Sequence, residues 1–244
     1  MSRWKASGIH LLLSAIIATV VVAFMLTLWY PWPLFEAAGG GQLLFILTGV
    51  DVTLGPLITL IVFKSGKKGM KFDLTFIACA QLLALAYGVH TMYLAHPVYV
   101  AFTVDSFDLV AARDLDPRDL AEAAFPQFKH MPLGRPQYIA VVGPQDPMER
   151  TKLIEALMKG KDLHMLPKYY VPYAQEAQNV VKHAHPLGTL LERAPEVVKS
   201  YLTASGRNEG SVRYLPLRGA RGDGSVLVDA TSGEPLKIIL VDPW

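Results

Sequence analysis

One short stretch places a carboxylate beside residues that distort a helix, in the middle of a long apolar run. Asp51 lies between Gly49 and Gly55, and Pro56 follows directly, all inside the hydrophobic run 43–63. A carboxylate is costly inside a bilayer, and Pro56 cannot donate a hydrogen bond to the carbonyl four residues earlier. We therefore expect a kinked helix with freed carbonyls beside Asp51. Such a notch can bind a partner or an ion, or Asp51 can be satisfied within the protein's own helices; the pattern leaves both open.

The depth of Asp51 indicates which side chain it would meet. At a rise of ~1.5 Å per residue, Asp51 lies roughly 12 Å inside the outer end of its run, and Tyr87 in the next apolar run lies at a similar depth. A phenol can donate to a carboxylate, so we expect Tyr87 to be a hydrogen-bond partner of Asp51. His10 and Cys79, which also lie in apolar runs, are interpreted as packing residues.

Composition places part of the chain in lipid. The 244 residues are 52% hydrophobic, with a mean hydropathy of +0.30. This is too apolar for an ordinary soluble domain, and the chain is too short for a large transporter. The formal net charge is +2, and the residues after Leu94 have nearly balanced charges of mixed sign, which gives no footprint for nucleic acid. The one cysteine cannot form an intramolecular disulfide.

Three apolar runs are each long enough to cross a bilayer. They cover about 8–29, 43–63 and 72–94. Lysine and arginine precede the first run, and four lysines follow the second, so the positive-inside rule puts both segments in the cytoplasm. Trp29, Tyr30 and Trp32 fit an interfacial belt on the other side. We expect the first run to be an uncleaved signal anchor; the alternative is a signal peptide cut near Ala37-Ala38, which the intervening Pro31-Trp32-Pro33 disfavours. Three crossings would put everything after Ala95 in the periplasm of a bacterium with two membranes.

The remainder of the chain has the pattern of a water-soluble α+β domain. We therefore divide the chain into a transmembrane domain, 1–95, and a periplasmic domain, 96–244. Strands are expected near 98–104, 107–110, 138–142, 212–217, 225–229 and 236–241. Asp116 and Asp146, each followed by proline, are expected to cap helices that run from 117 toward 124 and from 147 to a stop at 159–161. The second of these helices is expected to carry an apolar stripe of Leu153, Ile154, Leu157 and Met158. Further helices are expected near 174–184, 187–194 and 195–203. The segment 166–173 reads as an extended loop rich in tyrosine and proline.

Few residue clusters in the outer domain indicate chemistry. Tyr169 and Tyr170, with Tyr173 and the nearby prolines, can form a peptide-docking surface or pack over a sheet, and both interpretations stay open. The histidines at 164, 183 and 185 have no cysteine or carboxylate cluster to complete a metal site. No nucleophile elbow, phosphate loop or dinucleotide fingerprint occurs. We expect no enzyme activity, no metal and no cofactor.

An ordered set of short motifs resembles a known family. The set comprises Arg3-Trp4-Lys5-Ala6, Trp29-Tyr30-Pro31, Gly49-Val50-Asp51, Leu54-Gly55-Pro56-Leu57, Phe72-Asp73-Leu74, Ala86-Tyr87-Gly88, the Pro97 junction, Val228-Asp229-Ala230, Gly233-Glu234 and Asp242-Pro243-Trp244. Together they resemble the TfpX/TfpZ family of type IV pilin accessory proteins. The resemblance implies an inner-membrane helper, selective for its cognate pilin, that supports pilin assembly or pilus surface display. It supplies no catalytic residues.

A mechanism follows as a hypothesis. The helices around Asp51, with the notch at Gly49, Gly55 and Pro56 and with Tyr87, would receive the membrane helix of a type IV major pilin, because small residues permit close approach. The outer domain, including Tyr169 and Tyr170, would contact the pilin head. Other pilus assembly components and membrane lipid are further expected partners. The alternative is a membrane-anchored sensor whose periplasmic domain binds a ligand and acts through a partner protein.

Overall fold

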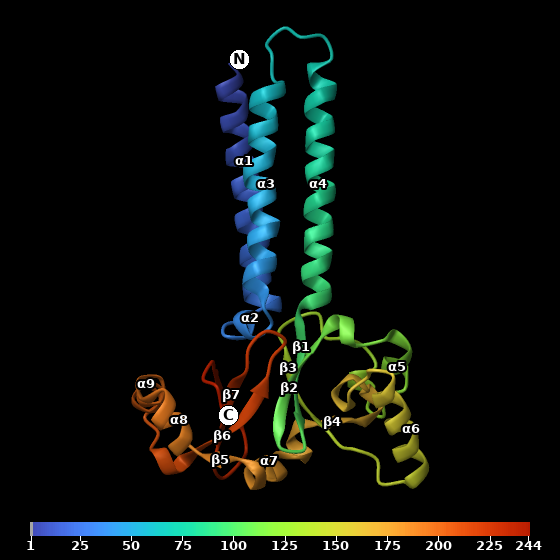
Figure 1. Cartoon of the computed structure of the whole chain (residues 1–244), viewed down its shortest axis with the longest axis vertical. Coiled ribbons are helices and arrows are strands. Elements are labelled where there is room, and N and C mark those ends of the chain that lie inside the picture. Colours follow the sequence, from blue (N-terminus) through green and yellow to red (C-terminus); the bar gives the residue numbers. More distant parts are fainter. Residues whose placement is uncertain (1) are drawn as a thin grey trace.

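Long helices stand side by side above a mixed α/β domain (Figure 1). A computed structural model describes residues 2–244, except for the side chains of Leu43, Ile46, Leu47, Val50 and Asp51. The long helices are α1 (Arg3–Phe24), which continues as the π-helical turn η1 (Met25–Trp29), α3 (Gly40–Val62) and α4 (Met70–Ala95). A short helix, α2 (Leu34–Ala37), lies in the connection between η1 and α3.

Local sequence sets where the long helices begin and end. The side chain of Ser2 caps α1, and α3 and α4 each begin after a glycine with positive φ, Gly39 and Gly69. The predicted distortion at Pro56 does not break α3, which runs as one helix past it. α4 ends just before Pro97, as expected for a residue that disfavours helical conformation in its predecessor.

Two helices among the described residues are long and apolar enough to cross a membrane. They are Arg3–Trp29 and Met70–Ala95, and Val52–Val62 within α3 is a shorter apolar stretch. Only 17% of the most apolar window of the first and 6% of that of the second are buried inside the protein. The core helix of a soluble protein would be mostly buried, so these exposed apolar surfaces favour membrane association.

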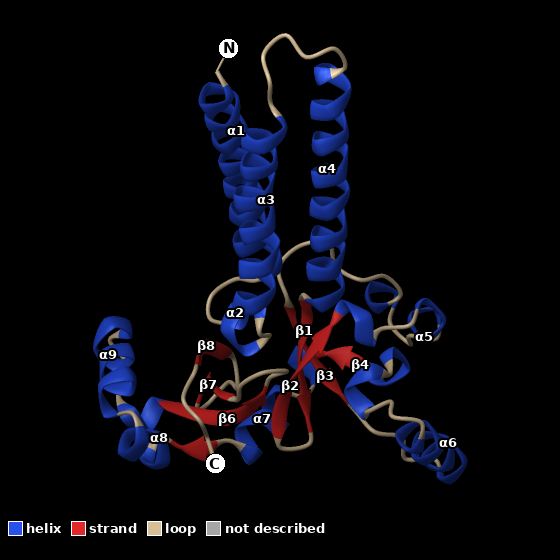
Figure 2. Ribbon diagram, turned by 45° about the horizontal axis from the view of Figure 1, so that its top comes forward, coloured by secondary structure: helices blue, strands red, loops and turns tan. Residues whose placement is uncertain are grey.

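The outer domain is built on one sheet, drawn in red in Figure 2. The strands are β1 (Pro97–Thr103), β2 (Ser106–Ala111), β3 (Gln137–Val141), β4 (Tyr170–Pro172), β5 (His185–Pro186), β6 (Val212–Arg218), β7 (Gly224–Asp229) and β8 (Pro235–Ile239). The order is β4-β3-β1-β2-β6-β7-β8, with β5 paired to β6. β1 pairs with β3 and β2 with β6 in parallel, and the other neighbours are antiparallel.

Five α-helices of the described residues lie around the sheet, all of them short. They are α5 (Pro117–Ala121), α6 (Pro147–Met158), α7 (Ala177–His183), α8 (Gly188–Arg193) and α9 (Pro195–Ser205). The predicted caps are confirmed: Asp116 accepts a hydrogen bond from Arg118 N, and Asp146 accepts one from Glu149 N. The apolar stripe predicted on α6 is mostly exposed, and of its members only Leu153 packs against the core.

Hydrophobic cores lie on both faces of the sheet. One includes Tyr99, Phe128 and Tyr170 beside α5, and the other includes Phe107, Leu215 and Val226. The second core also contains Leu34 of α2, which is only 5% exposed. A further cluster at the feet of the helices joins Met25, Tyr30 and Met92, and the Tyr30 hydroxyl donates to Met92 O at 2.8 Å. The helices and the sheet are therefore packed together rather than merely linked.

The segment 166–173 differs from its prediction. In place of an extended loop, it forms a 3-10 turn (Pro167–Tyr169), the edge strand β4 and a second 3-10 turn (Tyr173–Gln175). β4 pairs with β3, and Tyr170 lies opposite Val141 in this pairing. Because the partner strand lies about thirty residues earlier in the chain, the local sequence gives no signal for β4.

Candidate partner-binding site

Polar side chains join α1 to α3 near the N-terminal end of α1. Ser7 Oγ donates to Pro56 O at 2.8 Å, and His10 Nδ1 lies 2.6 Å from Thr59 Oγ1. Pro56 and Thr59 are both buried. His10 is therefore a hydrogen-bonding residue between helices, whereas the sequence pattern led us to interpret it as packing. The available signal was the spacing of Ser7, His10 and Ser14, which lie on one face of an otherwise apolar helix.

α3 and α4 meet at Gly55. A Cβ added there would lie 1.9 Å from Gln81 Nε2, so the end of the Gln81 side chain occupies the space that the glycine leaves. A Cβ added at Gly49 would meet nothing within 4 Å. The predicted notch is thus not a uniform opening: the space at Gly55 is filled by the chain's own α4, and that at Gly49 is open.

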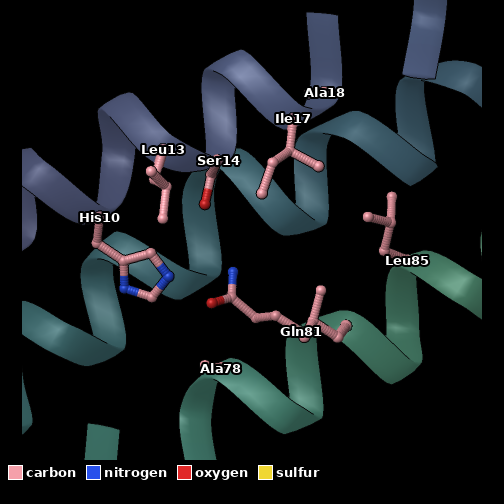
Figure 3. Close-up of a pocket in the computed structure, with 9 residues that line it drawn as sticks. His10, Leu13, Ser14, Ile17, Ala18, Ala78, Gln81 and Leu85 are labelled. Atoms are coloured by element: carbon pink, nitrogen blue, oxygen red, sulfur yellow. The ribbon is translucent and has the colours of Figure 1, made fainter. Parts of the chain in front are cut away.

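A groove opens between α1 and α4 beside this contact (Figure 3). Its volume is ≈ 190 Å³. The lining residues are His10, Leu13, Ser14, Ile17, Ala18, Ala78, Gln81, Leu82 and Leu85. Figure 3 shows the Ser14 hydroxyl and the Gln81 amide directed toward each other across the gap, with the His10 ring nearby. The groove therefore presents three polar side chains within an apolar wall.

Asp51 and Tyr87, the predicted hydrogen-bonded pair, lie on different helices. Asp51 belongs to the continuous helix α3, and its side chain lies outside the described residues. The Tyr87 ring is 75% exposed on α4, which places it on the outer surface of the helices. The hydrogen bond between them stays a prediction.

Tyr169 and Tyr170 belong to the core of the outer domain. Tyr170 is fully buried, its hydroxyl donates to His164 O, and burial raises the pKa of its phenol well above the ordinary value. Tyr169 is 8% exposed, with Lys168 Nζ 4.8 Å from its ring centroid. Tyr173 is half-buried and donates from its hydroxyl to Gly233 O. These positions agree with the packing interpretation and leave neither Tyr169 nor Tyr170 exposed enough to form a docking surface.

A buried carboxylate lies near the far end of the β1–β2 hairpin. Asp108 is 6% exposed and accepts a hydrogen bond from Thr103 Oγ1. Arg218 and His164 approach its carboxylate oxygens at 3.9 and 4.0 Å. A buried carboxylate requires such partners, so these side chains are explained by their role in stabilising Asp108 in the fold. Among the described residues, no group of three or more His, Cys, Asp or Glu side chains is arranged to hold a metal ion.

Asp229 organises the turn between β7 and β8. One oxygen accepts hydrogen bonds from Thr231 N and Ser232 N, both at 2.9 Å, and the other accepts one from Arg207 at 2.6 Å. The backbone donors and the guanidinium hold the pKa of the carboxyl below its usual range. Gly233 in the same turn has φ 74°, and a Cβ there would lie 2.2 Å from Ala177 O. The motif at 228–234 is thus required by the turn geometry.

Comparisons with known proteins identify the family. Residues 1–39 match the family model described as fimbrial assembly protein FimB. The chain is 33% identical over 219 residues to the fimbrial assembly protein of serogroup E1 from Dichelobacter nodosus, and 32% identical over 219 residues to that of serogroup I; each match covers 87% of this chain and 85% of the relative.

A third relative and the solved structures complete the comparison. The fimbrial assembly protein of serogroups C1 and C2 from the same organism is 37% identical over 121 residues, which cover 49% of this chain and 92% of that protein. No solved structure matches this chain. With a third of its residues shared over most of its length, the chain belongs to the family of fimbrial assembly proteins.

Proposed function

We propose that this protein is a non-catalytic, multi-pass inner-membrane accessory protein of the TfpX/TfpZ type. It binds the cognate type IV pilin and supports pilin assembly or surface display. Family membership supports the role in fimbrial assembly. The observation that carries the binding role is the groove between α1 and α4, where Ser14, His10 and Gln81 interrupt an apolar lining.

The proposed topology has three crossings. α1 with η1, α3 and α4 span the inner membrane, with the N-terminus and the lysine-rich connection 64–71 in the cytoplasm and residues 96–244 in the periplasm. The apolar surface that Arg3–Trp29 and Met70–Ala95 expose supports contact of these two helices with lipid, because exposing so much apolar surface to water is unfavourable. The crossing by α3, whose apolar stretch Val52–Val62 is shorter, is part of the proposal.

Topology is tested by labelling engineered cysteines in intact cells. The native Cys79 is exposed and is first replaced, Cys79→Ser. A membrane-impermeant maleimide that reaches the periplasm should label Ser232→Cys in the β7–β8 turn, and Ser65→Cys in the lysine-rich connection only after the inner membrane is opened. Equal labelling of the two positions in intact cells would contradict three crossings.

The groove explains how a membrane partner would be held. In lipid, the hydrophobic effect gives no drive for helices to associate, so packing and hydrogen bonds between helices select the partner. A groove with apolar walls and three polar side chains fits a transmembrane helix that carries a polar residue at the same level. The pilin, a protein with a hydrophobic N-terminal helix and an external head, is the proposed occupant. Asp51 is proposed as a second polar contact from α3.

Crosslinking tests the groove directly. A photoreactive residue at Ser14 should capture pilin in cells that assemble fimbriae. The same residue at Leu12, which is 63% exposed and lies on the other side of α1, should capture several-fold less. Capture from Leu12 as strong as from Ser14, or no pilin from either, would exclude the groove as the binding site. Asp51→Asn should weaken co-purification with pilin and leave membrane insertion unchanged.

A further inference from the structure

The loop that precedes β3 lies at the level where the helices meet the outer domain. β1 begins at Pro97, two residues after the end of α4, and Gln137 at the start of β3 pairs with Tyr99 in parallel. Gln137 is therefore two residues, or roughly 7 Å, from the helix end of β1. The residues before it, 129–136, must reach the feet of the helices, and Figure 1 shows this yellow-green segment there.

A side chain of this loop fixes it to the first long helix. Arg135 Nε donates to Thr27 O at 3.1 Å, and Thr27 lies two residues before the end of η1. Thr27 O is one of the last carbonyls of η1, where few backbone donors remain, and Pro31, four positions further on, supplies no N–H. A guanidinium at a helix C-terminus is also favoured by the helix dipole. Arg135 therefore caps η1 and holds the loop at the boundary of the proposed membrane span.

The loop presents an apolar side chain at this level. Leu133 is 84% exposed, although its neighbour Met131 packs against the core. Trp32 is 70% exposed and lines, with Arg135 and Pro136, a cleft of ≈ 640 Å³ beneath the helices. Lys129 and His130 in the same loop are exposed as well. An exposed leucine in a loop that also carries Lys129 and Arg135, with the exposed Trp32 lining the same cleft as Arg135, is the composition of a membrane-surface anchor.

We propose that loop 129–136 contacts the periplasmic surface of the bilayer, with Leu133 inserted at the boundary of headgroups and acyl chains. The guanidinium of Arg135 lies at the level of the lipid phosphates, where its remaining donors bind them. The ligand is thus a phospholipid surface, and the loop fixes the outer domain relative to the membrane plane. This inference rests on the membrane placement proposed above.

Spin labels on single cysteines test the depth of the loop. The full chain with Cys79→Ser is placed in nanodiscs of phosphatidylethanolamine and phosphatidylglycerol without any partner protein. Leu133→Cys is compared with Met158→Cys, which is equally exposed at 84% but lies at the end of α6, away from the helices. For each label, the collision rate with oxygen, which concentrates in lipid, is divided by the collision rate with a water-soluble nickel complex. This ratio should be several-fold higher for the label at position 133 than for the label at position 158.

A third position separates failure of this inference from failure of the topology. Leu83→Cys, 72% exposed along α4, reports whether the helices lie in lipid. If the label at 133 is as exposed to water as the label at 158 while the label at 83 lies in lipid, the loop contact is overturned and the membrane placement stands. A label at 83 in water would overturn the placement itself. Shielding of position 133 only in cells that make fimbriae would assign the loop to a protein partner and overturn the lipid contact.

Discussion

Gly55 allows α4 to approach α3, because the end of Gln81 lies where a side chain at position 55 would be. Gly55→Ala should displace the Gln81 amide from this space. We expect a loss of about 1 kcal/mol of stability relative to Gly49→Ala, since the displaced amide must find new partners in an apolar environment. Thermal unfolding of the detergent-solubilised protein measures the difference.

Gly49→Ala is the matched control, because Gly49 lies on the same helix as Gly55 and its new methyl group would meet nothing within 4 Å. It should leave the melting temperature unchanged or raise it slightly, because alanine is the better helix former. Adding Gln81→Ala to Gly55→Ala should recover part of the loss. Equal melting temperatures for the two glycine variants would show that the Gly55 contact does not hold α3 and α4 together.

Asp229 links turn stability to pH. Its folded pKa lies below the ordinary aspartate value, so its contribution is fully present above about pH 4 and declines as the pH falls further. Asp229→Asn keeps an oxygen for the turn amides but loses the charge that faces Arg207. We expect a loss of roughly 1.5–3 kcal/mol at neutral pH, the range for hydrogen bonds to charged groups.

Acid unfolding checks this assignment. Between pH 5 and pH 2 the stability of Asp229→Asn should fall less steeply than that of the unsubstituted protein, because one group with a depressed pKa has been removed. Glu149, whose pKa is held at about 2 by hydrogen bonds from Lys152 and Lys168, contributes to the remaining slope. Parallel pH curves would mean that Asp229 is not a source of acid sensitivity.

The β1–β2 hairpin contains a strained residue at its tip. Val104 adopts φ 33°, a left-handed conformation that β-branched residues disfavour, and it is 69% exposed. Val104→Asn should therefore stabilise the outer domain by up to about 1 kcal/mol, because asparagine tolerates this conformation and little packing is lost. A rise of the melting temperature of a few degrees would confirm it. Val142→Asn, at a partly exposed valine without positive φ, should give no such rise.

Local signals explain which elements the sequence could predict. The strands around Val100, Ile139 and Val226 and the helices capped by Asp116 and Asp146 were predicted because alternation and Asp-Pro caps are local. β4 and β5 were missed because each is short and depends on a partner strand far away in the chain. In the site, the bond of His10 to Thr59 and the contact of Gln81 with Gly55 depend on how the helices pack, which no single run of residues specifies.

The two halves of the molecule share a core. The sequence changes character at residues 95–96, yet Leu34 from the first half is buried in the second hydrophobic core of the sheet. Arg221 N donates to Ala37 O at 3.2 Å, and a Cβ at Gly219 would lie 2.7 Å from that same carbonyl. The connection between η1 and α3 thus packs against the sheet as part of the outer domain. A partner that moves the helices would therefore act directly on the sheet.

This shared packing predicts that residues 96–244 alone are less stable than the same domain in the full chain. Leu34→Ala in the full chain should cost about 2–5 kcal/mol, the usual range for truncating a buried leucine. Leu157→Ala is the control, since that leucine is 43% exposed on α6, and its truncation should cost far less. Urea unfolding gives the midpoints, followed by the fluorescence of Trp244 in chains whose other tryptophans, Trp4, Trp29 and Trp32, are replaced by phenylalanine. If the fragment 96–244 and the full chain unfold at the same urea concentration, Leu34 and the connection are not integral to the domain, and movement of the helices would leave the sheet unaffected.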